Sequence, residues 1–171
     1  LFVILQNGQI LGFDPNEGFC DEVMKLNDKA TFMTICRVRK SEDIFQWCYA
    51  FATEKGSVYI HDYFTMEEVN KFTIPEDNLV QFFFDFVSNC IVLVFSQKTV
   101  LLDVETGKIT DSVSVAGNRV TSFFGDFLMY GYDTGRVRRI GIENKKLVLF
   151  NYENKRINRQ KSDIPMLRPL S

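Results

Sequence analysis

The sequence contains few of the residues that most often carry reaction chemistry. Among its 171 residues there is a single histidine, His61, and there are only four cysteines, none of them in a Cys-x-x-Cys pair. Zinc sites need clustered ligands, so a metal centre is not expected. No glycine-rich phosphate loop joins a strand to a helix. These absences argue against an enzyme, and we expect no cofactor and no metal ion.

Signals for secretion and membrane insertion are also missing. There is no Asn-x-Ser/Thr sequon, no basic and apolar leader, and no apolar run long enough to span a bilayer. Three of the four cysteines lie in apolar segments, which favours buried thiols in a reducing compartment. We therefore expect a cytoplasmic or nuclear protein. Because the first residue is Leu1 rather than methionine, we expect a processed chain or part of a longer one.

The composition is that of a packed globular chain, with 46% hydrophobic and 14% aromatic residues. The charges are distributed unevenly. Residues 1–135 carry 10 Lys+Arg against 19 Asp+Glu, whereas residues 136–171 carry 10 Lys+Arg against 3 Asp+Glu. Such an asymmetry indicates either a basic end that meets an acidic partner or a solvated tail.

The segment 78–115 predicts the fold. It contains four short apolar runs, namely Leu79–Phe86, Cys90–Phe95, Thr99–Val104 and Ile109–Val115. Each run is rich in β-branched and aromatic residues, too short for a helix and bounded by turn formers. Four strands in fewer than about 40 residues are typical of one β-propeller blade.

The same arrangement recurs along the chain, in blades at about 1–26, 30–74, 79–115 and 119–152. Gly8, Gly56 and Gly135 mark the turn between the second and third strands of three of them. The predicted fold is therefore all-β: a β-propeller segment of four-stranded antiparallel meander blades over residues 1–156. Three blades are complete, and the first lacks its first strand. Residues 157–171 are expected to form an extended tail or linker.

Burial can also be predicted from the strands. Leu1–Leu5, Cys90–Phe95 and Phe127–Tyr130 are continuous apolar runs, as expected for strands covered on both faces by neighbouring blades. The fourth strands, Val69–Ile74 and Ile109–Val115, alternate with polar residues, as an outer edge should. The polar run at 39–43 is expected to be a loop.

The third strands carry a resemblance to a known family. Gly56–Tyr63, Lys98–Lys108 and, less closely, Gly8–Asp14 contain a turn glycine or its substitute, a β-branched run and an aspartate. This pattern resembles the WD-repeat β-propeller family, with His61, Leu102 and Phe13 where the family has tryptophan. The resemblance implies a non-catalytic scaffold that presents rigid surfaces to a multiprotein complex. Four blades are too few for a closed ring, so the rest of a parent chain, a partner or a second copy would complete it.

Two groups of residues are candidates for special chemistry. His61 is expected to be a packed, hydrogen-bonded ring rather than a catalytic base, because no nucleophile is spaced to use it. Asp14, Asp62 and Asp103 recur after the third strands. A ring of carboxylates would bind a cation, but one aspartate per turn is more simply a hydrogen-bond acceptor that stabilises the turn.

The C-terminal part offers candidate partner-binding residues. The basic ones are Arg136, Arg138, Arg139, Lys155, Arg156 and Arg159, and the apolar ones are Ile164, Met166 and Leu167. A nucleic-acid-associated propeller that uses the basic stretch is the alternative function. Strand alternation sends Arg136 and Arg138 to one face and Arg139 to the other, which favours a solvated edge. A protein partner is therefore the preferred hypothesis.

Overall fold

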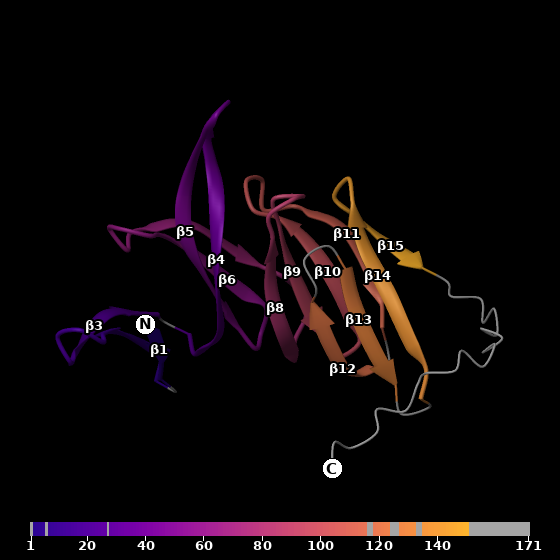
Figure 1. The fold of residues 1–171 in the computed structure, drawn as a ribbon, viewed down its shortest axis with the longest axis horizontal. Coiled ribbons are helices and arrows are strands. Elements are labelled where there is room, and N and C mark those ends of the chain that lie inside the picture. Colours follow the sequence, from indigo (N-terminus) through magenta and orange to yellow (C-terminus); the bar gives the residue numbers. More distant parts are fainter. Residues whose placement is uncertain are drawn as a thin grey trace, which may run out of the picture.

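The structure, a computed structural model, describes residues 2–5, 7–26, 28–115, 118–123, 127–132 and 135–150. These residues form 15 β-strands in four antiparallel sheets, with no helix in the described part of the chain (Figure 1). The all-β prediction is therefore confirmed. Within each sheet, every strand pairs with the strand next to it in the chain, so that each sheet is a meander.

The four sheets follow the chain. Blade 1 contains β1 (Phe2–Ile4), β2 (Gln9–Asp14) and β3 (Phe19–Lys25). Blade 2 contains β4 (Ala30–Ser41), β5 (Ile44–Thr53), β6 (Ser57–Asp62) and β7 (Glu68–Thr73). Blade 3 contains β8 (Leu79–Asp85), β9 (Cys90–Phe95), β10 (Lys98–Asp103) and β11 (Ile109–Ser114). Blade 4 contains β12 (Asn118–Phe123), β13 (Phe127–Tyr132), β14 (Val137–Glu143) and β15 (Lys146–Phe150).

Each pair of consecutive blades encloses its own apolar core. Ile10 of blade 1 packs with Phe51 and Tyr59 of blade 2. The cores between blades 2 and 3 and between blades 3 and 4 are built in the same way. The stacking of sheet on sheet thus removes apolar side chains from water, and this hydrophobic burial is the main contribution to the stability of such an arrangement. The predicted order of four meander blades, the first of them three-stranded, is observed.

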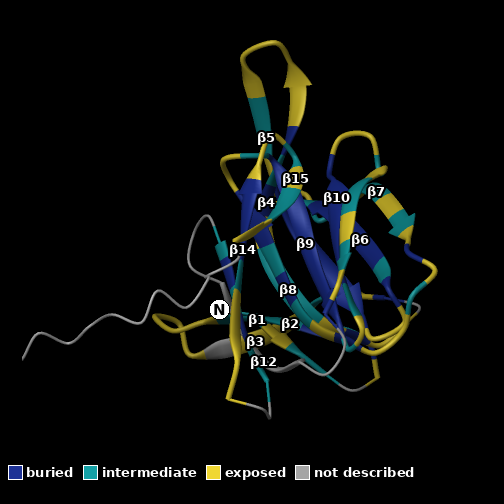
Figure 2. Cartoon of the chain, turned by 90° about the vertical axis from the view of Figure 1, so that its right-hand side faces the viewer, coloured by how far each residue is buried: buried dark blue, intermediate teal, exposed yellow. Residues whose placement is uncertain are grey.

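Burial follows the position of a blade in the stack. Every residue of β9 is buried, and β10 is buried except at its first residue, whereas β7 has only exposed and half-buried residues (Figure 2). Exposed and half-buried residues also alternate along β11, as predicted for outer strands. The continuous burial expected for β1 and β13 is wrong. In β13, buried and half-buried residues alternate over Phe127–Tyr130, and in β1 Val3 is exposed. The reason is that each of these strands is packed against a neighbouring blade on one face only.

The turns between second and third strands repeat as the glycines predicted. Gly8, Gly56 and Gly135 all have positive φ, between 73° and 85°. In each turn the glycine N–H donates to the carbonyl three residues earlier. A side chain at Gly56 would place Cβ 2.7 Å from the carbonyl oxygens of Ile74 and Glu76, so this position requires glycine for space as well as for conformation.

Irregularities in the ladders repeat as well. In each of the three four-stranded blades, the pairing of first and second strands shifts just after the first strand begins, at Ala30, Leu79 and Asn118. Such register shifts are β-bulges, which are regular features of a fold rather than defects. Its recurrence at one register position shows that the blades are structural copies of one unit.

Blade 2 departs from this unit at one end, where its first two strands continue beyond the body of the stack (Figure 1). Arg39 pairs with Phe45 and Ser41 with Ile44, so that a two-residue turn replaces the loop expected at 39–43. In blade 3, by contrast, the ladder ends before the turn at Asp85 and Cys90, the pair equivalent to Cys36 and Cys48. The polar sequence that suggested a loop belongs instead to a ribbon with both faces open to water.

Candidate functional site

The recurring aspartates stabilise turns, as predicted. The Asp62 carboxylate accepts hydrogen bonds from the N–H groups of Phe64 and Thr65 at 2.8 and 2.7 Å. The Asp103 carboxylate accepts from the N–H groups of residues 105 and 106, both at 2.9 Å. Asp14 does the same with residues 16 and 17. A carboxylate occupied in this way closes its turn, and in blade 4 Gly141 takes the same register position.

These bonds shift the pKa values of the carboxyl groups. The Thr65 N–H, the Gln46 amide and the Phe64 N–H together lower the pKa of Asp62 to about 2. For Asp103, burial acts in the opposite direction, but bonds from Lys145 and from two N–H groups outweigh it and lower the pKa. Both groups are ionised at neutral pH, because hydrogen bonds to a carboxylate favour its charged form.

His61 lies in the core between blades 1 and 2. The imidazole is buried, its Nδ1 lies 2.9 Å from the carbonyl oxygen of Met66, and its ring meets that of Phe51 edge to face at 5.9 Å. This is the packed, hydrogen-bonded ring that the sequence predicted. Among the residues that the structure describes, no three His, Cys, Asp or Glu side chains are grouped to hold a metal ion.

The predicted basic residues do not form one patch. The Arg138 guanidinium lies over the Tyr132 ring at 5.7 Å, whereas the Arg139 guanidinium lies over Phe127 at 4.0 Å and Phe150 at 4.9 Å. Arg138 thus packs on a ring on the face of blade 4 that is turned towards blade 3, whereas Arg139 packs on rings on the opposite face of blade 4. Arg136 is exposed just before β14, and its backbone carbonyl accepts a hydrogen bond from the Tyr132 N–H at 3.0 Å. Lys155, Arg156, Arg159, Ile164, Met166, Leu167 and the predicted tail 157–171 lie outside the described residues.

Exposed aromatic and aliphatic side chains gather instead at one end of blades 2 and 3. They come from the β4–β5 hairpin, the β6–β7 turn and the β8–β9 turn. We call this set the turn-face surface; it comprises the exposed residues Ile44, Trp47, Tyr63, Phe64, Phe86 and Val87, together with the half-buried Phe45. Phe64 is 83% exposed, Val87 85% and Trp47 48%. Large apolar side chains in turns are unusual, and gathered ones mark interaction sites.

Contacts between rings join this surface. The Trp47 and Phe86 ring centroids are 6.1 Å apart, and those of Tyr63 and Phe64 are 5.0 Å apart. Trp47, Tyr63 and Phe64 together with Ile35 line a hollow of about 290 Å³. This volume is at the lower limit of small-molecule pockets, which span about 300–1,000 Å³. The hollow therefore suits one apolar side chain of a partner better than a free ligand.

The position of the surface explains why no blade covers it. Ile35 faces blade 1 from β4 and is 42% exposed, whereas Phe84, at the same register position in blade 3, is 5% exposed. Ile35 is exposed because blade 1 has no first strand to lie opposite it. Trp47, Phe64 and Phe86 differ, since they lie at or beyond the level where the blades turn.

A polar network holds the hairpin against blade 3. The Arg37 guanidinium donates to the Phe86 carbonyl at 2.8 Å and to the Asn89 side chain at 3.2 Å. The Asn89 amide in turn donates to Glu105 at 2.9 Å, and Glu105 also pairs with Arg39 at 3.5 Å. Arg37 lies over the Phe45 ring at 4.5 Å. The hairpin is therefore held in place by its own base, and its aromatic side chains are presented on a fixed support.

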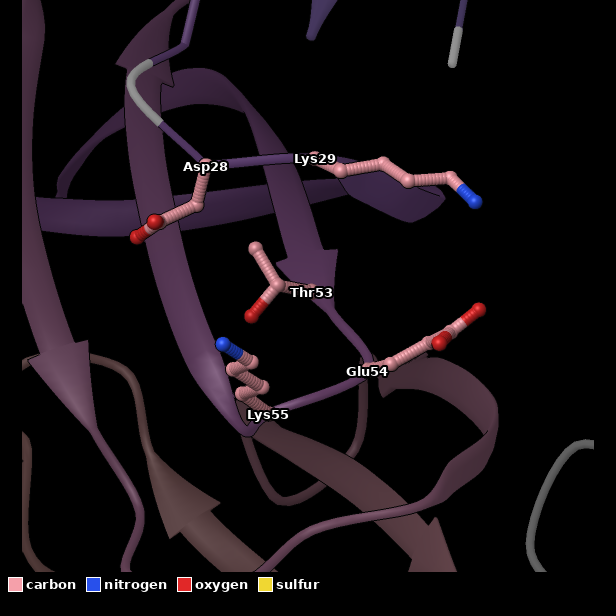
Figure 3. A pocket seen from close by; sticks show the side chains of 5 residues that line it. All are labelled: Asp28, Lys29, Thr53, Glu54 and Lys55. Atoms are coloured by element: carbon pink, nitrogen blue, oxygen red, sulfur yellow. The ribbon is translucent and has the colours of Figure 1, made fainter. Parts of the chain in front are cut away.

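A second hollow lies at the opposite end of blade 2 (Figure 3). It has a volume of about 190 Å³ and is lined by Asp28, Lys29, Thr53, Glu54 and Lys55. Figure 3 shows Lys29 and Glu54 extending to one side, while the Lys55 amino group lies towards Thr53. Asp28 already accepts a hydrogen bond from Tyr59 at 2.6 Å, and the Thr53 hydroxyl accepts one from the Ser57 N–H. Two of its polar groups thus serve the fold, so this hollow is the weaker candidate.

The sequence offered a signal for the turn-face surface that its interpretation missed. Phe64 follows Asp62 within a turn, and Phe86 and Val87 follow Asp85 within another. Polar residues are usual at such positions. The sequence pattern places Phe86 at the end of the predicted strand Leu79–Phe86. The position of all three residues between a turn-forming aspartate and the next strand identifies them instead as exposed.

No helix in the described ranges is long and apolar enough to cross a membrane. A scan against protein-family models matches no family, and a search of curated proteins finds no match. The function is therefore inferred from the geometry of the molecule itself.

Proposed function

We propose that this chain is a non-catalytic protein-interaction module, a set of WD-repeat-like propeller blades that binds a protein partner through the turn-face surface. The observation that carries the proposal is the group of exposed rings beside arginine on a braced hairpin. Tryptophan, tyrosine and arginine dominate the binding energy of protein interfaces, and aromatic residues are enriched there. A rigid support keeps the entropy lost on binding small.

The stack itself supports the scaffold role. The outer faces of blades 1 and 4 carry exposed or half-buried apolar residues, Val3 and Met129 for example, that a neighbouring blade would cover, as blades 2 and 4 cover blade 3. Further blades from the parent chain, from a partner or from a second copy would complete a ring. In such a ring, the turn-face surface would remain open at one end of the propeller.

A nucleic-acid partner is less well supported. Arg138 and Arg139 lie over rings on opposite faces of their own blade, and the whole chain carries a net charge of −2. Binding to phosphates requires a continuous basic surface. The turn-face surface contains apolar rings, which are better suited to a protein.

The test uses a variant in which Trp47 and Phe64 are both replaced by serine. Its matched control replaces Val137 and Leu149 by serine, because these residues are also exposed and apolar but lie in blade 4. Tagged wild-type, variant and control chains are compared by quantitative mass spectrometry of captured proteins, with nuclease present. The captured protein is then purified, and its Kd for each chain is measured.

We expect capture by the wild type and the control, and a Kd at least about tenfold higher for W47S/F64S, as for the loss of interface hot spots. Circular dichroism establishes that all three chains are folded. Equal Kd values for all three would overturn the proposal. A partner that is captured only when nuclease is left out would overturn it too and favour the nucleic-acid alternative.

A further inference from the structure

Cys36 of β4 and Cys48 of β5 lie directly opposite each other in the antiparallel ladder of blade 2. In such ladders, opposite Cα atoms are about 4.5 or 5.5 Å apart, and disulfides span Cα separations of about 4.4–6.8 Å. Both side chains are buried in the same core cluster, between blades 2 and 3. An S–S bond can therefore form here without separating or sliding the strands.

The equivalent positions of blade 3 provide an internal comparison. Cys90 occupies the position of Cys48, since both lie opposite the turn aspartate, Asp103 or Asp62. Across the ladder, however, Cys90 faces Asp85 rather than a second thiol. Blade 2 is thus the only described blade with a thiol pair at this place, and it is also the blade whose hairpin projects.

We propose that Cys36 and Cys48 form a reversible cross-strand disulfide, a redox-sensitive covalent link at the base of the projecting hairpin. The pair lies next to Arg37 and Trp47, where the hairpin leaves the blade stack. Oxidation would covalently join β4 to β5 at this point. The inference does not depend on the proposed function, because formation of the disulfide is measured directly and not through partner binding.

The oxidant is a peroxide. The Cys48 thiolate attacks one peroxide oxygen, the O–O bond breaks, and a sulfenic acid and water result. The Cys36 sulfur then attacks the sulfenic sulfur; the S–S bond forms, the S–O bond breaks and a second water leaves. Two thiols lose two electrons and two protons in all, and hydrogen peroxide is reduced to two waters. A thiol such as glutathione reverses the step by disulfide exchange.

The surroundings assign Cys48 as the sulfur that reacts first. The neighbouring Cys36 thiol lowers the pKa of Cys48, whereas the Cys48 thiol and burial raise the pKa of Cys36. Both side chains are fully buried, so peroxide reaches them when the hairpin opens locally. Exposed Cys20 would react without opening and is therefore removed in the test.

The experiment treats a Cys20→Ser variant of the whole chain with hydrogen peroxide, alkylates the remaining thiols under denaturing conditions and maps tryptic peptides without reduction. We expect a linked pair of peptides, 30–37 and 41–55, about 2 Da lighter than their sum. Cys90 should stay alkylated, and dithiothreitol should restore all three thiols. Hydrogen exchange over residues 37–47 should become slower in the oxidised chain.

Cys36→Ala and Cys48→Ala in the same background are the controls, and neither should yield linked peptides. The mapping of the Cys20→Ser chain stands even if a control fails to fold. The inference is wrong if peptides 30–37 and 41–55 stay unlinked under peroxide that oxidises free dithiothreitol. It is also wrong if Cys48 accumulates as sulfinic acid, or if Cys90 takes part in the link.

Discussion

Strands β9 and β13 hold the same place in their blades but are buried differently. Ile91 and Leu93 face blade 2, Val92 faces blade 4, and all three are buried. In β13, Leu128 and Tyr130 are buried against blade 3, but Met129, at the position of Val92, is only half-buried. Both strands are apolar throughout. The burial of a strand in this fold is therefore set by the neighbouring blades and not by its own sequence.

The largest expected effect tests this difference directly. Leu93→Ala removes a fully buried side chain from the core between blades 2 and 3 and should lower the free energy of unfolding by about 2–5 kcal/mol. Met129→Ala removes a side chain of similar size from the open face of blade 4 and should cost less than about 1 kcal/mol. Urea denaturation measures both. Equal losses would mean that the face of blade 4 is covered in solution.

A smaller effect is expected in the turns. Gly56→Ala should cost about 2–3 kcal/mol, because it adds a clash with two carbonyl oxygens to the strain of positive φ. Gly135→Ala in blade 4 has similar φ, but no described atom lies within 4 Å of its new Cβ. It should cost only about 1 kcal/mol. Thermal unfolding of the two variants compares an inner blade with an end blade, and a Gly135→Ala loss as large as that of Gly56→Ala would contradict the packing.

The smallest effect concerns the turn carboxylates, which blade 2 has and blade 4 replaces with Gly141. Asp62 has a pKa of about 2 in the folded chain against an ordinary value of 3.8. Since the folded value is the lower one, the ionised carboxylate stabilises the fold above about pH 4, and this contribution is lost as the pH falls towards 2. Asp62→Asn should be less stable than the wild type at pH 7.

At pH 2 the stabilities of Asp62→Asn and the wild type should converge, as measured by urea midpoints across this range. Asp43→Asn, in the two-residue turn of the β4–β5 hairpin, serves as the control. A stability difference between Asp62→Asn and the wild type that stays constant from pH 7 to pH 2 would refute the assignment.

Much of the fold could be predicted from the sequence, because local chemistry determines it. Turn glycines and aspartates separate short β-branched runs, and both are used as the pattern indicated, at Gly56 and Asp62 for example. The extension of β4 and β5 was missed because a ribbon outside the stack has no buried face. Its polar residues around Lys40 are therefore indistinguishable from a loop by periodicity alone.

The candidate site was harder to predict, since it is assembled from three segments. Trp47 lies in a strand and Phe64 in a turn of the same blade, whereas Phe86 lies in a turn of blade 3 and joins them through the stacking of blades 2 and 3. The basic stretch was a candidate because a run of charged residues can be recognised from the sequence alone, whereas the faces on which the charges lie cannot. Register then divided Arg138 and Arg139 between opposite faces of blade 4.

The order of the blades also bears on how the chain acquires its structure. Each sheet pairs only strands adjacent in sequence, and each core joins only consecutive sheets. No contact in these cores has to wait for a distant segment of the described chain. During translation, each completed sheet would therefore offer an apolar template to the next as it leaves the ribosome.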